Sequence, residues 1–441
     1  MKIGLVSLGC PKNLVDSEVM LGLLSAAGHE ITNDPAQAEA IIVNTCSFIG
    51  PAREEATQAI EEMARYRRAG SCRRLIVAGC WPQQAGIARL GEQFPEVDAF
   101  MGPDAVPRIV EILTGERPPA PGAAPRYLYD HTTPRLRATA PWTAYVKIAD
   151  GCNHACSFCV IPGVRGRYRS RELESIVAEA EGLAAGGARE INLIAQDTTA
   201  YGSDRYGRHR LPELLARLAA IAVLKWIRVL YACPALIGDE LLDVMAAHER
   251  ICTYLDVPFQ HAHPDILRAM RRAGSGDEYL GLIERMRARM PEMAIRTSLL
   301  VGFPGETEEH FAALLRFVER AQFDRAGVFR YSREVGTPAA EMAGQVPAEV
   351  AQERYDRLMG LQQEISLRRN ERWIGQTMEA LIEQPSEEGR RWVGRSFRDA
   401  PEIDGTVVVS APRALRPGQF VPVKITRALP YDLEGRVASG T

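Results

Sequence analysis

Three cysteines within one short stretch of the chain could together hold a metal centre. Cys152, Cys156 and Cys159 form a CxxxCxxC pattern, and no fourth cysteine follows nearby to complete a tetrahedral site. A structural zinc ion requires four closed ligands, whereas an iron–sulfur cluster held by three thiolates keeps one iron open to another ligand. The pattern therefore favours an iron–sulfur cluster whose open iron binds a chelating small molecule.

A zinc knuckle completed by His154 is the simplest alternative to this cluster. It would require the loop to fold sharply back on itself, because His154 lies between the first two cysteines. The cluster remains the better interpretation. Phe158, which precedes the last cysteine, would then offer an aromatic surface beside the cluster.

A second set of cysteines is spread along the N-terminal part of the chain. Each member follows a predicted strand: Cys10 follows residues 3–8, Cys46 follows 41–44, and Cys80 follows 75–79. The carboxyl ends of parallel strands meet at one edge of a sheet, so the three thiols can converge although they are far apart in sequence. An isolated cysteine after a strand is as often a core residue. The placement shared by all three favours a common site.

The elements that must position these cysteines divide the chain into several units, because 441 residues exceed what one hydrophobic core usually supports. Residues 1–117 alternate short apolar runs with amphipathic stretches, which predicts a parallel-sheet α/β domain, and a proline-rich linker follows at 118–142. Residues 143–375 repeat the alternation of strands and helices, as is typical of a partial or complete β/α barrel. Short alternating runs at 376–441 predict a small all-β barrel.

Composition narrows the classes of protein. A formal net charge of −3 argues against binding nucleic acid through bulk charge. No run approaches the roughly 20 apolar residues of a membrane span, and the N-terminus lacks a signal sequence, so we expect a cytoplasmic protein. An odd count of nine cysteines favours metal or redox chemistry over disulfides. Cys72, Cys233 and Cys252 lie outside both sets and are predicted to be structural thiols.

The CxxxCxxC loop at the end of the first barrel strand resembles the radical S-adenosylmethionine superfamily. The resemblance implies that the open iron binds the amino and carboxylate groups of S-adenosylmethionine, which an electron from the cluster cleaves to methionine and a hydrogen-abstracting deoxyadenosyl radical. It also implies cofactor contacts at Gln196 and Asp197, after the second strand, and at Gly302, after the fifth. The alternative for Gln196 and Asp197 is that they cap the following turn.

With both cysteine sets and the terminal barrel considered together, the whole chain resembles the methylthiotransferase family. The resemblance implies a TRAM-like barrel and two four-iron clusters. The implied ligands are Cys10, Cys46 and Cys80 for an auxiliary cluster, and Cys152, Cys156 and Cys159 for the radical cluster. One S-adenosylmethionine molecule would methylate the sulfur and another would supply the radical. The sequence identifies neither the sulfur donor nor the electron donor.

Two branches of this family differ in substrate. The run SLGCPKNLVDSE at 7–18 resembles the branch that modifies the β-carbon of an aspartate of small-subunit ribosomal protein twelve, whereas Gln-Met-Asn typically follows the first cysteine in the tRNA branch. Residues 395–405 resemble the same branch, and the balanced charge of the tail agrees with a protein substrate. The implied product is 3-methylthioaspartate and the implied partner is this ribosomal protein, free or on the ribosome, with no direct tRNA substrate and no membrane.

Two alternatives stay open at this point. The first is a tRNA adenosine methylthiotransferase with the same chemistry. The second is a non-catalytic metal-binding module that docks on the ribosome through its tail.

Two groups of charged residues could contact the substrate. Alternating arginines (Arg165, Arg167, Arg169 and Arg171) lie beside the radical loop and could meet the target aspartate, or could pair with carboxylates of the barrel. Three acidic residues of the tail (Asp399, Glu402 and Asp404) could steer a basic ribosomal protein, or could be ordinary solvated turn residues.

Overall fold

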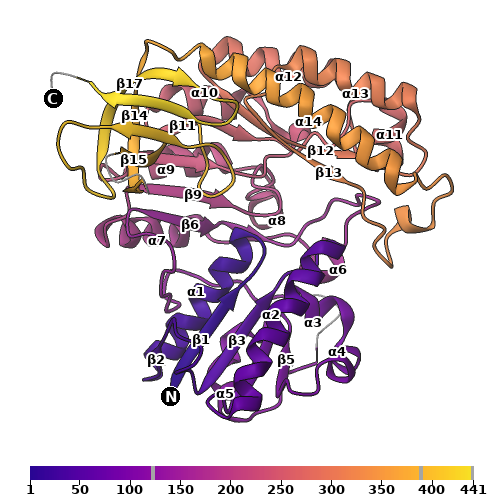
Figure 1. The fold of residues 1–441 in the computed structure, drawn as a ribbon, viewed down its shortest axis with the longest axis vertical. Helices are drawn as coiled ribbons and strands as arrows, with labels where there is room; N and C mark the ends of the chain where they lie inside the picture. Colours follow the sequence, from indigo (N-terminus) through magenta and orange to yellow (C-terminus); the bar gives the residue numbers. More distant parts are fainter. Residues whose placement is uncertain (121–124, 387–390, 439–441) are drawn as a thin grey trace.

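The computed structural model describes residues 1–120, 125–386 and 391–438, which form three consecutive units (Figure 1). A five-stranded parallel sheet comes first, a six-stranded parallel sheet follows, and a closed five-stranded barrel ends the chain. This arrangement confirms the predicted fold class. The boundaries at 117, 142 and 375 stay predictions, and parts of the linker (121–124) and tail (387–390 and 439–441) lie outside the described residues.

The first unit is a parallel sheet in the order β2-β1-β3-β4-β5, flanked by helices. Its strands are β1 (Lys2–Ser7), β2 (Glu30–Ile31), β3 (Ala40–Thr45), β4 (Arg74–Gly79) and β5 (Ala99–Met101). Its helices are α1 (Pro11–Ala26), α2 (Gly50–Ala69), α3 (Cys80–Ala85), α4 (Ile87–Gln93), the 3₁₀ helix η1 (Pro103–Arg108) and α5 (Ile109–Thr114). Strand β3 is buried along its whole length, as expected of a central strand covered on both faces.

Helix α1 is longer than the sequence pattern predicts. The pattern places it at 17–27, whereas it begins at Pro11, directly after the N-cap residue Cys10. Proline is favoured at the first helical position because its missing N–H would be unpaired there anyway. Apolar and polar side chains are both buried along this helix, so its sequence shows little amphipathic pattern. The buried carboxylates of Asp16 and Glu18 bond residues beyond the first unit.

The central unit is an open sheet in the order β13-β12-β11-β10-β9-β6, in which every pairing is parallel. Neighbours in the sheet are consecutive strands of the unit, as in a β/α barrel that does not close. The strands are β6 (Thr143–Lys147), β9 (Glu190–Ile194), β10 (Trp226–Val229), β11 (Ile251–Asp256), β12 (Ala294–Val301) and β13 (Arg325–Arg330). A small antiparallel pair lies beside the sheet, formed by β7 (Ala149–Asp150) and β8 (Arg169–Ser170).

Helices connect the strands of the central unit. They are α6 (Ile161–Arg165), α7 (Leu173–Ala185), α8 (Ser203–Tyr206), α9 (Leu211–Ala219), α10 (Asp239–Ala247), α11 (Pro264–Ala269), α12 (Gly276–Arg289), α13 (Glu308–Ala321) and α14 (Ala348–Glu371), with 3₁₀ helices η2 (Pro234–Leu236) and η3 (Pro338–Glu341). None of the described helices is long and apolar enough to cross a membrane.

The C-terminal unit is a closed barrel in the order β14-β15-β16-β18-β17. Its strands are β14 (Thr377–Pro385), β15 (Arg391–Ser396), β16 (Val407–Ser410), β17 (Phe420–Ala428) and β18 (Leu433–Val437). The sequence pattern predicts β14, β16 and β17 but misses β15 and β18. Both missed strands are short and carry charged side chains, so they have no apolar run to detect.

The part of the linker that the structure describes is packed between the first two units. Arg135 is 7% exposed and bonds Glu18 of α1 at 2.5 Å and Glu179 of α7 at 2.6 Å. A Cβ atom on Gly22 of α1 would lie 2.4 Å from the carbonyl oxygen of Pro134, so glycine is required for this close approach. The linker therefore fixes the first unit against the second.

Buried ion pairs dock the C-terminal barrel on the central sheet. Glu190 of β9 is fully buried and accepts hydrogen bonds from Arg395 of β15 at 2.7 Å and from Arg228 of β10 at 3.2 Å. These bonds lower the pKa of Glu190 to about 2, although burial alone would raise it. The charges at this interface compensate one another, as buried charges must.

The prediction that acidic tail residues steer a basic partner is wrong for Asp399 and Asp404. Asp399 binds Arg325 of β13 at 2.7 Å, and Asp404 binds Arg296 of β12 at 3.3 Å; both carboxylates have side chains only 1% exposed. They belong to the interface with the central sheet, so they are inaccessible to another protein. Glu402 is exposed, and its role stays a prediction.

Replacing Glu190 by glutamine tests the ion pairs that dock the barrel. At neutral pH we expect E190Q to destabilise the protein by on the order of 3 kcal/mol, because Arg395 and Arg228 lose their buried counter-charge. A carboxylate whose pKa is lowered by folding stabilises the fold above its ordinary pKa, and this contribution is lost as the pH falls through about 2. The difference between variant and wild type should therefore shrink between about pH 4.5 and 2, as measured by urea unfolding followed through tryptophan fluorescence.

The matched control is Glu213→Gln, which removes a partly exposed partner of Arg210 near the surface and should change the unfolding midpoint little. Equal midpoints of E190Q and wild type at pH 7 would contradict a stabilising role for this pair.

Candidate functional site

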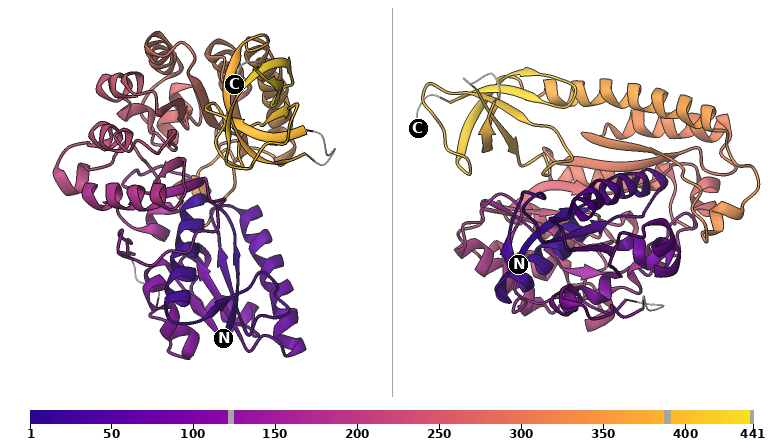
Figure 2. Two further views of the ribbon diagram at one scale, coloured as in Figure 1. Left: turned by 90° about the vertical axis from the view of Figure 1, so that its left-hand side faces the viewer. Right: turned by 60° about the horizontal axis from the view of Figure 1, so that its bottom comes forward.

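The structure brings Cys10, Cys46 and Cys80 to one edge of the first sheet. They follow β1, β3 and β4, which are neighbours in that sheet, and these strand ends face the central unit (Figure 1 and Figure 2). Burial raises the pKa of Cys80 to about 11, and the neighbouring Cys10 and Cys46 thiolates add to this shift. The chain moves from one side of β1 to the other between β2 and β3, and such switch points are where α/β sheets bind ligands.

Two glycines permit the close packing around these three cysteines. A Cβ on Gly9 (φ 85°) would lie 2.5 Å from the Cβ of Cys46, and one on Gly79 (φ 99°) would lie 2.3 Å from Oδ1 of Asn44. Both have left-handed backbone angles that favour glycine. Glycine is therefore required by the backbone at both positions.

The second triad lies on the loop that follows β7. Burial raises the pKa of Cys159 to about 12, and the adjacent Cys156 and Cys152 contribute in the same direction. Nη1 of Arg272 lies 3.8 Å from Sγ of Cys156, so a cation faces this triad. Thiols with raised pKa values bind metal as thiolates by releasing protons, which a cation nearby favours.

The spacing of the sulfur atoms distinguishes between kinds of metal centre. All six cysteines are free thiols, and among the described residues neither triad forms a group whose ligand atoms all lie within 4.8 Å of one another. Two sulfurs bound to one zinc ion at about 2.3 Å each are at most about 4.6 Å apart. Neither triad is therefore gathered around a single zinc ion, and the assignment of an iron–sulfur cluster to each triad stays a prediction.

His154 does not complete a zinc knuckle. Its Nε2 atom lies 2.6 Å from Oδ2 of Asp197, and the two residues form a compact group with Cys233. The hydrogen bond to Asp197, followed by that to Cys233, raises the pKa of His154 to about 11. No sequence pattern predicts this contact, because Cys233 has no recognisable spacing from the triad and is expected to be only a structural thiol.

Gln196 and Asp197 differ in how much of their bonding capacity is used. Oδ1 of Asp197 accepts a hydrogen bond from the backbone N–H of Thr199 at 3.0 Å, as expected of a turn cap, and Oδ2 faces His154. Nε2 of Gln196 donates to Asp150 at 2.8 Å, but its Oε1 is buried and has no hydrogen-bond partner in the described part of the chain. A buried, unpaired acceptor is costly unless a ligand donates to it. Of the two residues, Gln196 fits a cofactor contact better.

Phe158 and Gly302 lie close together through Phe303. The rings of Phe158 and Phe303 pack edge to face, with centroids 6.4 Å apart. Gly302 has a φ of 74°, and a Cβ there would lie 2.6 Å from the Cβ of Ala351 in α14, so packing alone already requires glycine. Contacts of Phe158 and Gly302 with a cofactor stay predictions.

Helix α6 links the two triads. It begins two residues after Cys159 and ends at Arg165. The guanidinium of Arg165 bonds Asp16 of α1 at 2.6 Å. The same guanidinium acts to lower the pKa of the neighbouring Cys80 thiol, which favours its thiolate form. Cys159 and Arg165 are six positions apart, which spans on the order of 10 Å in a helix. Both triads therefore belong to one site between the first two units.

The prediction that the alternating arginines meet the substrate is wrong for Arg165 and Arg171. Arg165 is 2% exposed and paired with Asp16 and Asp150, and Arg171 is equally buried and paired with Glu179. The alternative, pairing with carboxylates, describes both. Arg167 is exposed and its contact with substrate stays a prediction.

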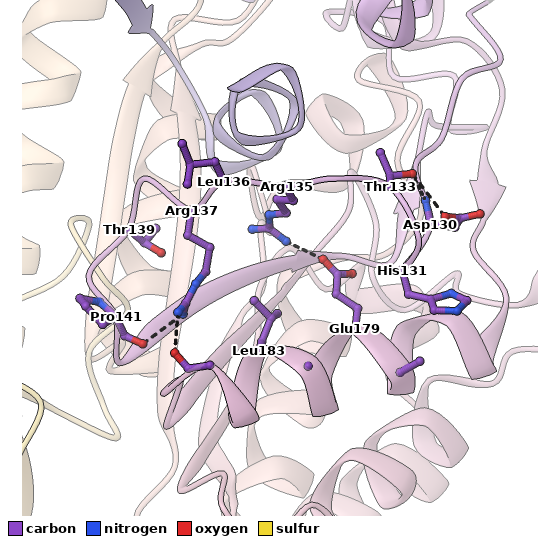
Figure 3. A pocket seen from close by; sticks show the side chains of 13 residues that line it. Asp130, His131, Thr133, Arg135, Leu136, Arg137, Thr139, Pro141, Glu179 and Leu183 are labelled. Atoms are coloured by element: carbon purple, nitrogen blue, oxygen red, sulfur yellow. Dashed lines mark hydrogen bonds and ion pairs between the residues drawn. The ribbon is translucent and has the colours of Figure 1, made fainter. Parts of the chain in front are cut away.

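A cavity of about 580 Å³ lies elsewhere, between the linker and α7 (Figure 3). Arg137 crosses it and donates hydrogen bonds to the carbonyl oxygens of Pro141 and Gly186, at 3.0 and 2.9 Å. Arg135 and Glu179 also line it. None of the predicted site residues, all of which the structure describes, contributes to its wall, so it is separate from the cysteine site.

Family profiles match the three units separately. The Radical SAM superfamily matches residues 146–318, the Uncharacterized protein family UPF0004 matches 2–102, and the TRAM domain matches 374–438. Among solved structures, the radical S-adenosylmethionine methyltransferase TsrM from Kitasatospora setae has a TM-score of 0.57 at 18% identity, covering 77% of this chain and 76% of its own. The cobalamin-dependent radical enzyme OxsB has a TM-score of 0.52 at 10% identity, covering 82% and 56%. These two likenesses establish the fold alone.

Sequence relatives extend over the full length. The "Ribosomal protein uS12 methylthiotransferase RimO" of Desulforamulus reducens is 52% identical over 99% of both chains. That of Heliobacterium modesticaldum is 51% identical over 99% of this chain and 95% of its own. The fold and the cysteine loop define a radical S-adenosylmethionine enzyme, with S-adenosylmethionine and iron–sulfur chemistry. The chain belongs to the RimO-type family of radical S-adenosylmethionine methylthiotransferases.

Gln196→Ala tests the role of the unpaired Oε1 atom. We expect the affinity of the cluster-loaded protein for S-adenosylmethionine to fall about tenfold or more, because a hydrogen bond from the charged amino group is lost. Equilibrium dialysis measures this affinity, and the iron content should stay unchanged. Gln345→Ala, at an exposed position, is the matched control, and equal affinities of the two variants would contradict the contact.

Proposed function

We propose that this chain is a radical S-adenosylmethionine methylthiotransferase that modifies the β-carbon of an aspartate in ribosomal protein uS12. The observation that carries this proposal is the identity of about half of all residues, over the full length, to relatives named for that reaction. The two cysteine triads, linked by α6, support a reaction that needs two metal centres in one site. Cys10, Cys46 and Cys80 would hold an auxiliary four-iron cluster, and Cys152, Cys156 and Cys159 the radical one.

The clusters and S-adenosylmethionine, when bound, supply hydrogen abstraction, sulfur and the methyl group. The side chains of the protein bind and orient these groups and shield them from water. Oε1 of Gln196 would accept a hydrogen bond from the cofactor's amino group, and Arg272 would offset negative charge at Cys156. Arg165 would do the same beside Cys80. Burial of these groups excludes water, which strengthens each of these interactions.

Two features favour a protein substrate over tRNA. Pro11 and Lys12 follow the first cysteine where the tRNA branch typically has Gln-Met-Asn. In the C-terminal barrel, Arg395 and Arg398 are buried in ion pairs and so are not available to bind phosphate. A ribosomal protein substrate also implies that the chain works in the cytoplasm, where ribosomes are found.

Iron content tests the assignment of two clusters. Anaerobically reconstituted wild type should bind about eight irons per chain. The triple variant Cys10→Ala, Cys46→Ala, Cys80→Ala should bind about four, and the same substitutions at Cys152, Cys156 and Cys159 should also leave about four. Cys72→Ala is the control and should keep the wild-type content, because this buried thiol lies outside both triads. A triple variant with unchanged iron content would contradict two separate clusters.

Mass spectrometry of uS12 and of total tRNA tests the substrate. In cells that lack this chain, one aspartate of uS12 should lose the mass of the methylthio group, and methylthiolated tRNA adenosine should be unchanged. Restoring the wild-type gene should restore the modification of uS12, whereas the triple variant at Cys152, Cys156 and Cys159 should not. Loss of the tRNA modification instead would establish the alternative substrate.

A further inference from the structure

Lys12 reaches from the first unit toward the carboxyl end of β10 in the central sheet. It is the second residue of α1, two positions after Cys10, and only 8% of it is exposed. Its Nζ atom lies 3.3 Å from the centroid of the Tyr231 ring. Tyr231 comes two residues after β10, at the carboxyl end where β/α enzymes bind their substrates. Lys12 therefore lies between the auxiliary triad and the mouth of the partial barrel.

The ammonium group of Lys12 has no carboxylate partner within ion-pair distance among the described residues. The nearby Asp256 already binds Arg296 at 2.8 Å. Other buried cations of this interface are different: Lys147 and Arg165 share two carboxylates. A contact with an aromatic ring offsets only part of the cost of burying an ammonium group. The sulfur of Cys10 also faces this cation, but as a metal ligand it would share its negative charge with the cluster, so the ammonium group can still attract an anionic ligand.

The Tyr231 backbone is held in an unusual conformation that keeps its ring over Lys12. Tyr231 has a φ of 62°, which is rare for a bulky side chain. Its carbonyl oxygen accepts a hydrogen bond from the N–H of Thr198 at 3.0 Å, and its own N–H donates to Asp256 at 3.3 Å. Backbone strain of this kind persists where surrounding bonds enforce it, commonly at ligand sites.

We propose that Lys12 binds the side-chain carboxylate of the substrate aspartate, while Tyr231 holds the ammonium group in place. This inference rests on the proposed function and names the residue that selects an acidic side chain. A carboxylate on Lys12 would present its β-carbon beside the auxiliary triad, because Cys10 is two residues away. An adenine base carries no carboxylate, so it would not form this ion pair with the ammonium group.

A double-substitution cycle tests this contact with cluster-loaded enzyme and full-length uS12. The enzyme change is Lys12→Met, and the substrate change replaces by asparagine the aspartate that mass spectrometry shows to be modified. We expect Lys12→Met to weaken binding of wild-type uS12 at least tenfold, measured as Kd by fluorescence anisotropy and as KM. The same variant should change binding of the asparagine substrate less than twofold, because the partner of Lys12 is already absent.

Three controls separate substrate binding from a structural role. Lys12→Arg should retain most of the affinity, and Lys2→Met, at a surface position that pairs with Glu30, should match wild type. In Lys12→Met, iron content and the electron paramagnetic resonance signals of the clusters should be unchanged, which shows that the variant is folded and loaded.

Equal losses of affinity for both substrates, or altered iron content or cluster signals in Lys12→Met, would overturn the proposal and leave the proposed function intact. If wild-type enzyme does not modify uS12, the proposed function fails first, and the role of Lys12 fails with it.

Discussion

A buried group of four charges, Asp16, Asp150, Lys147 and Arg165, holds the catalytic half of this protein together. None of the four side chains is more than 7% exposed, and each cation contacts both carboxylates. Burial would raise the pKa of Asp150, but Lys147 and Arg165 lower it well below its usual range. Removing any one member would leave an uncompensated charge in a medium of low polarity, so the four act as a unit.

This group fixes the geometry of the metal site because its members lie on the segments that carry the cysteines. Asp16 is on the helix that starts at Cys10, and Asp150 precedes the loop that carries the second triad. Arg165 ends the helix after Cys159 and faces Cys80. One set of ion pairs therefore sets the distance between the two triads. Buried ion pairs also hold the terminal barrel on the central sheet, where Glu190 pairs with Arg228 and Arg395.

Most of the fold follows from the sequence, because the parallel strands are continuous apolar runs and the cysteines come directly after them. The apolar runs at 190–194 and 295–301 coincide almost residue by residue with β9 and β12. Prediction failed where polar side chains are buried between units: α1 begins six residues earlier than its pattern indicates, and β15 and β18 have no apolar run. Local patterns cannot report burial that another unit provides.

The sequence by itself determined the chemistry, since ligand type and the CxxxCxxC spacing lie within one loop, and the other three cysteines each follow their own strand. Only the tertiary structure decided which charges are available to a substrate. Asp16 and Lys147 are 131 residues apart in the chain, and Arg325 and Asp399 are 74 apart, so no local pattern reveals these pairs. Ion pairs with distant or buried partners neutralise four of the charges: Arg165, Arg171, Asp399 and Asp404. Lys12 contacts an aromatic ring and has no such ion pair among the described residues. Ion pairing depends on contacts that form only when distant segments are buried together, because burial is what makes an unpaired charge costly.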